Sequence, residues 1–208
     1  MTGTPRLATA AWLALLPCAA PAQPQVLDLD PAHCFVHFEV LHFGTSTLRG
    51  RFGPLAGEVQ FDAVAGRGRV GLTIDLNTLD TGLKLLDARL RQPDLLDVAA
   101  QPTAWFVAER LRFERGLPVE LTGEFTLRGV GQALTLTAQQ VSCRDGRCGG
   151  DFEGWLSRSA FGASFGVPLV ADRVHLRVQV EGRLRTPPPV PTVTPAADGQ
   201  RQPRAAND

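Results

Sequence analysis

Three histidines lie close together near the start of the chain and could ligate a metal ion. They are His33, His37 and His42. Side chains alternate between the two faces of a strand, so His33 and His37 would share one face and His42 the other. Three ligands cannot converge from that arrangement without a bulge. We therefore expect surface histidines here and no metal site.

Three carboxylates, Asp87, Asp94 and Asp97, could supply general acid–base chemistry. On a polar helix face, such groups more often are solvated or cap a helix end. The sequence contains no nucleophile elbow, zinc-protease helix or Gly-rich phosphate loop. We predict no catalytic residue.

Two cysteines flank an Asp-Gly pair, which favours a two-residue hairpin turn. In that register Cys143 and Cys148 face each other as a non-hydrogen-bonded pair, with Cα atoms about 4.5 Å apart. A disulfide tolerates this spacing. We predict a structural Cys143–Cys148 disulfide, with a redox CxxxxC motif as the alternative. Cys34 is expected to be a buried single thiol.

One arginine, Arg158, is in phase with the apolar residue Leu156 and should point inward. It would either pair with a buried acid or contact the head group of a ligand. We favour the structural role.

The element that must position these groups runs from His33 to Phe61. Val36, Phe38 and Val40 alternate with His37 and Glu39, which predicts a strand with one buried face. Glycines then follow at positions 44, 50, 53 and 57. Glycines in a strand pattern mark bulges and bends, and long bent strands curl an antiparallel sheet into a barrel. We predict a barrel with an apolar interior.

The same alternation recurs along the chain, at 70–76, 121–127, 134–136, 152–156 and 174–180. Residues 103–113 are ambiguous because Trp105, Phe106 and Val107 are consecutive. One apolar and one polar face on strand after strand indicates a single curled sheet.

The segment from Thr81 to Pro102 breaks the pattern. Leu83, Leu86 and Leu90 share a helical face, and Pro93 suits the first turn of a second short helix containing Leu95 and Leu96. A helical insertion here would close one end of the barrel or form its lid.

The two ends of the chain differ from the middle. Residues 1–22 combine Arg6, an apolar run and a small-residue cleavage site, and predict a secretory signal peptide. Lipid anchoring at Cys18 is the alternative. Residues 186–208 are Pro-rich and predict a disordered tail. Residues 26–184 then form one domain. Twenty-one basic residues balance twenty-one acidic ones, so nothing suggests a nucleic-acid partner.

Several short motifs resemble the YceI-like family of bacterial polyisoprenoid-binding proteins. Their order and spacing carry the resemblance: Asp30-Pro31-Ala32-His33, Val36-His37-Phe38-Glu39-Val40-Leu41-His42, Leu48-Arg49-Gly50-Arg51-Phe52, 57–62, Phe125-Thr126-Leu127-Arg128-Gly129-Val130 and Arg158-Ser159-Ala160-Phe161-Gly162. In the insertion, Arg89 stands where the family usually has histidine, and Leu95-Leu96 where it has aromatics. Because the residues that replace the aromatics are also apolar, the resemblance still implies a packing role for this segment.

The resemblance implies an all-β fold: a single extended, eight-stranded, antiparallel, lipocalin-like barrel with a short helical insertion between its third and fourth strands. It implies a periplasmic or secreted binding protein that sequesters a long-chain isoprenoid or fatty lipid, with a polyprenyl quinone as one option, and no cofactor. The apolar phase of the strands gives the candidate lipid-binding residues: Val36, Phe38, Val40, Phe52, Leu72, Ile74, Leu76, Phe106, Phe125, Leu127, Leu134, Leu136 and Phe161.

Three alternatives stay open at this stage. An isomerase or hydrolase could act on a hydrophobic substrate in the same cavity, and a convergent carboxylate–histidine pair there would favour it. A barrel filled by its own side chains would need no ligand. The chain could be a monomer or a homodimer. No transmembrane segment is expected after signal cleavage.

Overall fold

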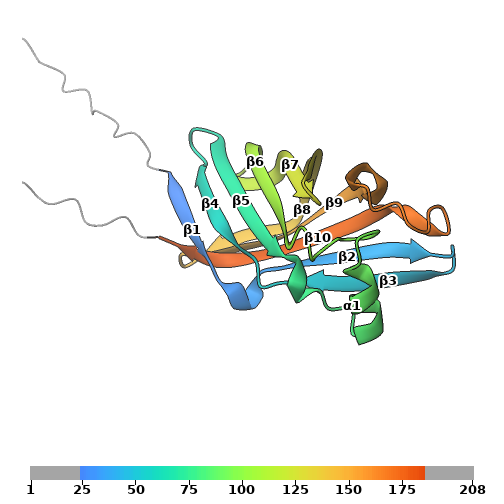
Figure 1. Cartoon of the computed structure of the whole chain (residues 1–208). Coiled ribbons are helices and arrows are strands. Elements are labelled where there is room, and N and C mark those ends of the chain that lie inside the picture. The colour runs from blue at the N-terminus through green and yellow to red at the C-terminus, as the bar shows by residue number, and fades with distance from the viewer. Residues whose placement is uncertain (1–23, 186–208) are drawn as a thin grey trace, which may run out of the picture.

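The computed structural model describes residues 24–185, which form one antiparallel sheet of ten strands (Figure 1). The strands are β1 (Gln25–Leu29), β2 (Phe35–His42), β3 (Ser46–Phe52), β4 (Ala56–Asp62), β5 (Arg67–Asp75), β6 (Thr103–Glu114), β7 (Leu117–Leu127), β8 (Val130–Arg144), β9 (Arg147–Ser157) and β10 (Val170–Leu184). One α-helix, α1 (Lys84–Leu90), and three 3₁₀ turns, η1 (Pro31–His33), η2 (Leu76–Thr78) and η3 (Arg158–Phe161), interrupt them. The predicted signal peptide and Pro-rich tail lie outside the described residues.

The ten strands form an eight-stranded barrel, as predicted, because two pairs of them are long strands with a bend. β1 and β2 both pair with β10. On their other edges, β1 pairs with β4, and β2 pairs with β3. One long strand bends at η1, between β1 and β2. The other bends at 53–55, between β3 and β4, where Gly53 is one of the glycines expected to bend the chain. The β1–β10 pairing closes the ring.

The two ends of this barrel are built differently. β1, β4 and the end of β10 close the ring through backbone pairing, and we call this part the closed half. Around β2 and β3 the ring is open, because the far edge of β3 makes a single β-bridge, Arg51 to Asp80, within residues 24–185. Residues 76–102, here called the insertion, lie between β5 and β6 in the chain and supply that bridge; we call this part the mouth half.

The apolar phase of the strands faces inward, as the alternation predicted. Val36, Phe38 and Val40 are buried, whereas His37 and Glu39 between them are not. The ambiguous stretch 103–113 also has a defined phase. Phe106 is buried between Ala104 and Ala108, and Trp105 and Val107 point outward. Small residues on either side of Phe106 leave room for its ring inside the barrel.

Only the first of the two predicted helices forms. It is α1, with Leu86 and Leu90 half-buried and Leu83 exposed at its N-cap. The second prediction is wrong: residues 91–100 are turns. Arg128 donates to the carbonyls of Pro93 and Leu95, each at 2.7 Å, which a helix would need for its own hydrogen bonds. Within the described residues, no helix has the length and apolar character needed to cross a membrane.

Candidate functional site

The mouth half contains an apolar cavity of about 120 Å³. Its wall combines strand residues of the barrel with residues of the insertion and of the segment before β10: Val36, Phe38, Val40, Phe52, Ile74, Leu76, Leu90, Leu95, Leu96, Ala104, Phe125, Leu127, Leu156, Arg158, Ala163, Val174 and Leu176. Arg158 is the single charged residue of that wall, so the cavity is suited to a hydrocarbon.

The structure brings together only part of the predicted lipid-binding set. The members that line the cavity are Val36, Phe38, Val40, Phe52, Ile74, Leu76, Phe125 and Leu127. The remaining members are buried but do not line it: Leu72, Phe106, Leu134, Leu136 and Phe161. They follow the same inward phase, yet pack among side chains of the core. Phe161, for example, packs edge-on against Phe125 with ring centres 5.7 Å apart.

Several lining residues were absent from the prediction. Leu90, Leu95 and Leu96 come from the insertion, and Ala163 from the segment after η3. The helical pattern and the apolar pair in the insertion indicated a lid, but a lid's inner face cannot be read from strand alternation. Val174, Leu176 and Leu156 shared the predicted apolar phase and were available from the sequence alone.

Arg158 is buried and has a structural role, but within residues 24–185 its hydrogen bonds go to backbone carbonyls and the acid near it, Asp172, is only half-buried. Its Nη1 donates to the carbonyls of Ala163 at 2.6 Å and Phe165 at 2.8 Å. Its Nε donates to Ala171 at 2.9 Å, and its Nη2 to Val170 at 2.8 Å. Burial lowers the pKa of the Arg158 guanidinium from its usual value. It stays protonated at neutral pH, because an arginine begins far above that range. This one side chain fixes the segment before β10.

Two more arginines fix the insertion in the same way. Arg128 holds the carbonyls of Pro93 and Leu95, and Arg91 donates to those of Asn77 and Leu79, at 3.2 and 2.8 Å. Arg89 makes a two-pronged ion pair with Asp94, with both N–O distances 2.7 Å. Its guanidinium also lies 4.3 Å from the ring centre of Phe165. The two segments that cover the cavity therefore touch each other through Arg89 and Phe165.

The candidate metal and acid–base residues do not converge. His33 lies in η1 rather than on a strand, where its Nδ1 is 3.0 Å from Asp30. Asp87 is buried, not solvated, and accepts hydrogen bonds from the backbone and hydroxyl of Thr81 at 2.8 and 2.7 Å. Across residues 24–185, no group of three His, Cys, Asp or Glu side chains could hold a metal ion.

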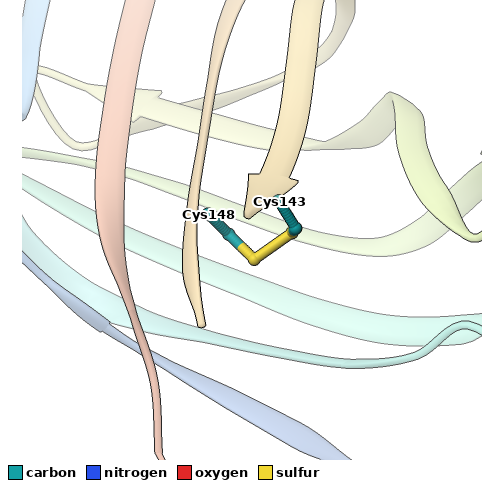
Figure 2. The surroundings of a disulfide bond; sticks show 2 residues. All are labelled: Cys143 and Cys148. Carbon is teal, nitrogen blue, oxygen red and sulfur yellow. A yellow bond between two sulfur atoms is a disulfide. The ribbon is translucent and has the colours of Figure 1, made fainter. Parts of the chain in front are cut away.

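The predicted disulfide is present at the tip of the β8–β9 hairpin. Figure 2 shows Cys143 and Cys148 joined across the ends of two adjacent strands, with Cα atoms 4.1 Å apart. Asp145 and Gly146 both have positive φ, 52° and 74°, as the expected two-residue turn requires. Cys34 is a buried free thiol, also as predicted; its Sγ donates to the carbonyl of Glu181 at 3.2 Å. Burial raises the pKa of this thiol.

These features define a small antiparallel β-barrel that strand pairing closes in one half, with an apolar cavity under a braced cover in the other. Comparison with known families then places it: the chain belongs to the YceI-like family, since the YceI-like domain matches residues 27–182. A UPF0312 protein of Pseudomonas aeruginosa is 33% identical over 162 residues, covering 75% of this chain and 84% of the relative. A UPF0312 protein of Vibrio parahaemolyticus is 28% identical over 171 residues, covering 80% and 90%.

Solved structures show the same fold. BcnA of Burkholderia cenocepacia superimposes with a TM-score of 0.66 at 23% identity, covering 74% of this chain and 99% of BcnA. A polyisoprenoid-binding domain from Saccharophagus degradans, implicated in plant cell wall breakdown, gives a TM-score of 0.60 at 17% identity, covering 77% and 98%. At these identities the likeness concerns architecture.

Proposed function

We propose that the protein binds a long-chain lipid of the polyisoprenoid kind in the cavity of its mouth half, and carries or sequesters it in the periplasm. The observation that carries the proposal is the cavity wall, which is hydrocarbon except for Arg158. The likeness to the polyisoprenoid-binding domain of S. degradans supports the same ligand class. The signal-peptide pattern in residues 1–22 supports export.

Hydrocarbon burial supplies the binding free energy in this account. Each buried methylene contributes roughly 0.8 kcal/mol before ordering costs, so a long isoprenoid needs no special polar partner. The guanidinium of Arg158 faces four carbonyls, which leaves little donor capacity for a head group. A polyprenyl quinone is one suitable lipid, and the chain rather than its head would set the affinity.

The cover must move for such a ligand to enter. At about 120 Å³ the cavity is smaller than the roughly 300–1,000 Å³ of pockets that hold drug-sized ligands. Leu90, Leu95 and Leu96 sit in the wall on a segment that carries no strand pairing beyond the Arg51–Asp80 bridge within the described residues. Displacing them lengthens the cavity without breaking the barrel.

The small volume also favours one alternative, a barrel that holds no ligand. The test is solvent extraction of the purified protein, with the extract identified by mass spectrometry. Phe125→Asp puts a carboxylate in the wall, and the matched control Thr126→Asp puts it on the outer face one residue away. We expect lipid in the wild type and the control and none in folded Phe125→Asp. An extract without lipid from all three supports the empty barrel.

A further inference from the structure

One end of the barrel exposes a group of bulky apolar side chains. They are Leu41, Phe43, Phe165, Val167 and Leu169, which we call the apolar rim. Phe43 and Phe165 are each 56% exposed, and Leu169 is 62% exposed. Figure 1 shows the two segments that carry them, the β2–β3 turn and the loop before β10, at the same end of the molecule. The amide of Phe43 donates to the carbonyl of Leu169 at 2.7 Å and joins the two.

The apolar rim adjoins the wall and the cover of the cavity. Val40 and Ala163 line the cavity, and each lies one or two residues from a rim member. Arg158, also in the wall, holds the carbonyl of Phe165. Through the contact of Arg89 with the Phe165 ring, α1 adjoins the rim and adds the exposed side chains of Leu83 and Leu85.

The charge around the rim is unusual for surface loops. Residues 41–47 and 162–169 contain no Asp, Glu, Lys or Arg. The adjoining elements carry two exposed cations: Lys84, between Leu83 and Leu85 at the start of α1, and Arg173, four residues after Leu169, stacked on the ring of Trp155 at 4.4 Å. Nearby carboxylates are engaged: Asp94 by Arg89, Asp87 by Thr81, and half-buried Asp172 by the amide of Ser159. The result is an uncharged apolar tip beside basic side chains.

We propose that the apolar rim docks on a lipid bilayer with anionic head groups. The proposal rests on the proposed function, because it gives the lipid a route between bilayer and cavity. Apolar tips with neighbouring cations match the interfacial region of such a membrane, where hydrocarbon and negative charge are adjacent. A bilayer also suits the placement of the rim next to the cavity cover, since a chain can then move into the cavity without exposing its carbons to water.

The test is sedimentation of the full chain with vesicles of phosphatidylethanolamine and phosphatidylglycerol, and with vesicles of phosphatidylcholine alone. The double variant Phe43→Ser/Leu169→Ser removes two rim side chains. Val64→Ser is the matched control, because Val64 is 88% exposed in the β4–β5 turn of the closed half. All forms share the same termini, so any contribution of those segments cancels.

We expect wild type and Val64→Ser to bind the anionic vesicles, and the double variant to bind at least about tenfold more weakly. Lys84→Gln/Arg173→Gln should weaken binding to the anionic vesicles and leave the weaker binding to phosphatidylcholine unchanged. Circular dichroism melts check folding, and Phe165→Ser replaces the double variant if that variant unfolds.

The proposal is overturned if wild type binds neither vesicle, or if the folded rim variants bind as well as wild type. A wild-type dimer that the double variant converts to monomer, with no vesicle binding, would make the rim a contact between two copies and also overturn it. Lipid extraction of the same preparations separates the two ideas. Extracted lipid without vesicle binding would refute only the docking proposal. Vesicle binding without extracted lipid would refute only the proposed lipid-binding function.

Discussion

The closed half and the mouth half of this barrel are held together by different interactions. In the closed half, backbone pairing of β1 with β4 and β10 completes the ring, and side chains such as Phe61 and Phe113, with ring centres 6.5 Å apart, fill it. In the mouth half, arginine side chains bind carbonyls of the covering segments, and a cavity remains beneath.

The difference indicates a division of work along one sheet. Water cannot replace the contacts that tightly packed apolar side chains make with one another. The closed half should therefore contribute most of the free energy of unfolding. Hydrogen bonds from half-buried arginines such as Arg91 and Arg128 to carbonyls can exchange for bonds to water, so their net contribution is smaller and they can open. The cover can therefore move while the barrel stays folded.

The largest expected effect is the loss of a packed leucine from the core. Leu136 is 1% exposed and lies outside the cavity wall. Leu136→Ala should lower the free energy of unfolding by about 3 kcal/mol. Leu96→Ala, in the half-buried cover, should cost about 1 kcal/mol or less. Denaturant titrations of both variants measure the contrast. Equal losses would show that the core and the cover are packed alike.

Replacing Arg158 should have the next largest effect. Arg158→Met leaves four carbonyls without their donor and should cost about 2–3 kcal/mol, since hydrogen bonds to a charged group are at stake. Amide hydrogen exchange should accelerate in residues 162–171 and stay unchanged in β8. Unchanged exchange in both would mean that the segment is held by its own packing.

Removing the disulfide should cost less. The two cysteines are separated by 5 positions in the sequence. For so short a loop, chain entropy predicts a stabilisation of about 2 kcal/mol. Cys143→Ser/Cys148→Ser should lower the melting temperature and leave extractable lipid unchanged, because the hairpin tip lies outside the cavity wall. A loss of lipid would connect the hairpin with the mouth half.

The smallest effect concerns pH. Burial, with the neighbouring charges of Arg51 and Arg177, lowers the pKa of His37 below its usual 6.5. Below pH 6.5 the unfolded chain then binds a proton that the folded chain does not, so stability falls as pH drops through this window. His37→Gln should reduce the difference in unfolding free energy between pH 7.5 and 5. An unchanged difference would assign it to other groups.

The sequence predicted the barrel well because strand alternation depends on local geometry. Inward and outward faces at Phe38, Ile74 and Phe125 followed from period two alone. The Asp-Gly turn likewise fixed the register that joins Cys143 to Cys148.

Strand alternation could not predict which of the buried residues reach the cavity. Leu72 and Ile74 share a strand and a phase, but only Ile74 reaches the cavity, since that depends on what lies across the barrel. The turns at 91–100 were also missed, because Arg128, distant in sequence, takes the carbonyls that a helix would use.

The central claim is that a lipid occupies the mouth half and leaves the closed half unchanged. Amide hydrogen exchange of the delipidated protein, with and without a long-chain isoprenoid alcohol, tests it directly. The account predicts slower exchange in residues 84–98 and 158–171 when the alcohol is present, and no change in the β8–β9 hairpin. Unchanged exchange throughout, or protection confined to the hairpin, would contradict it.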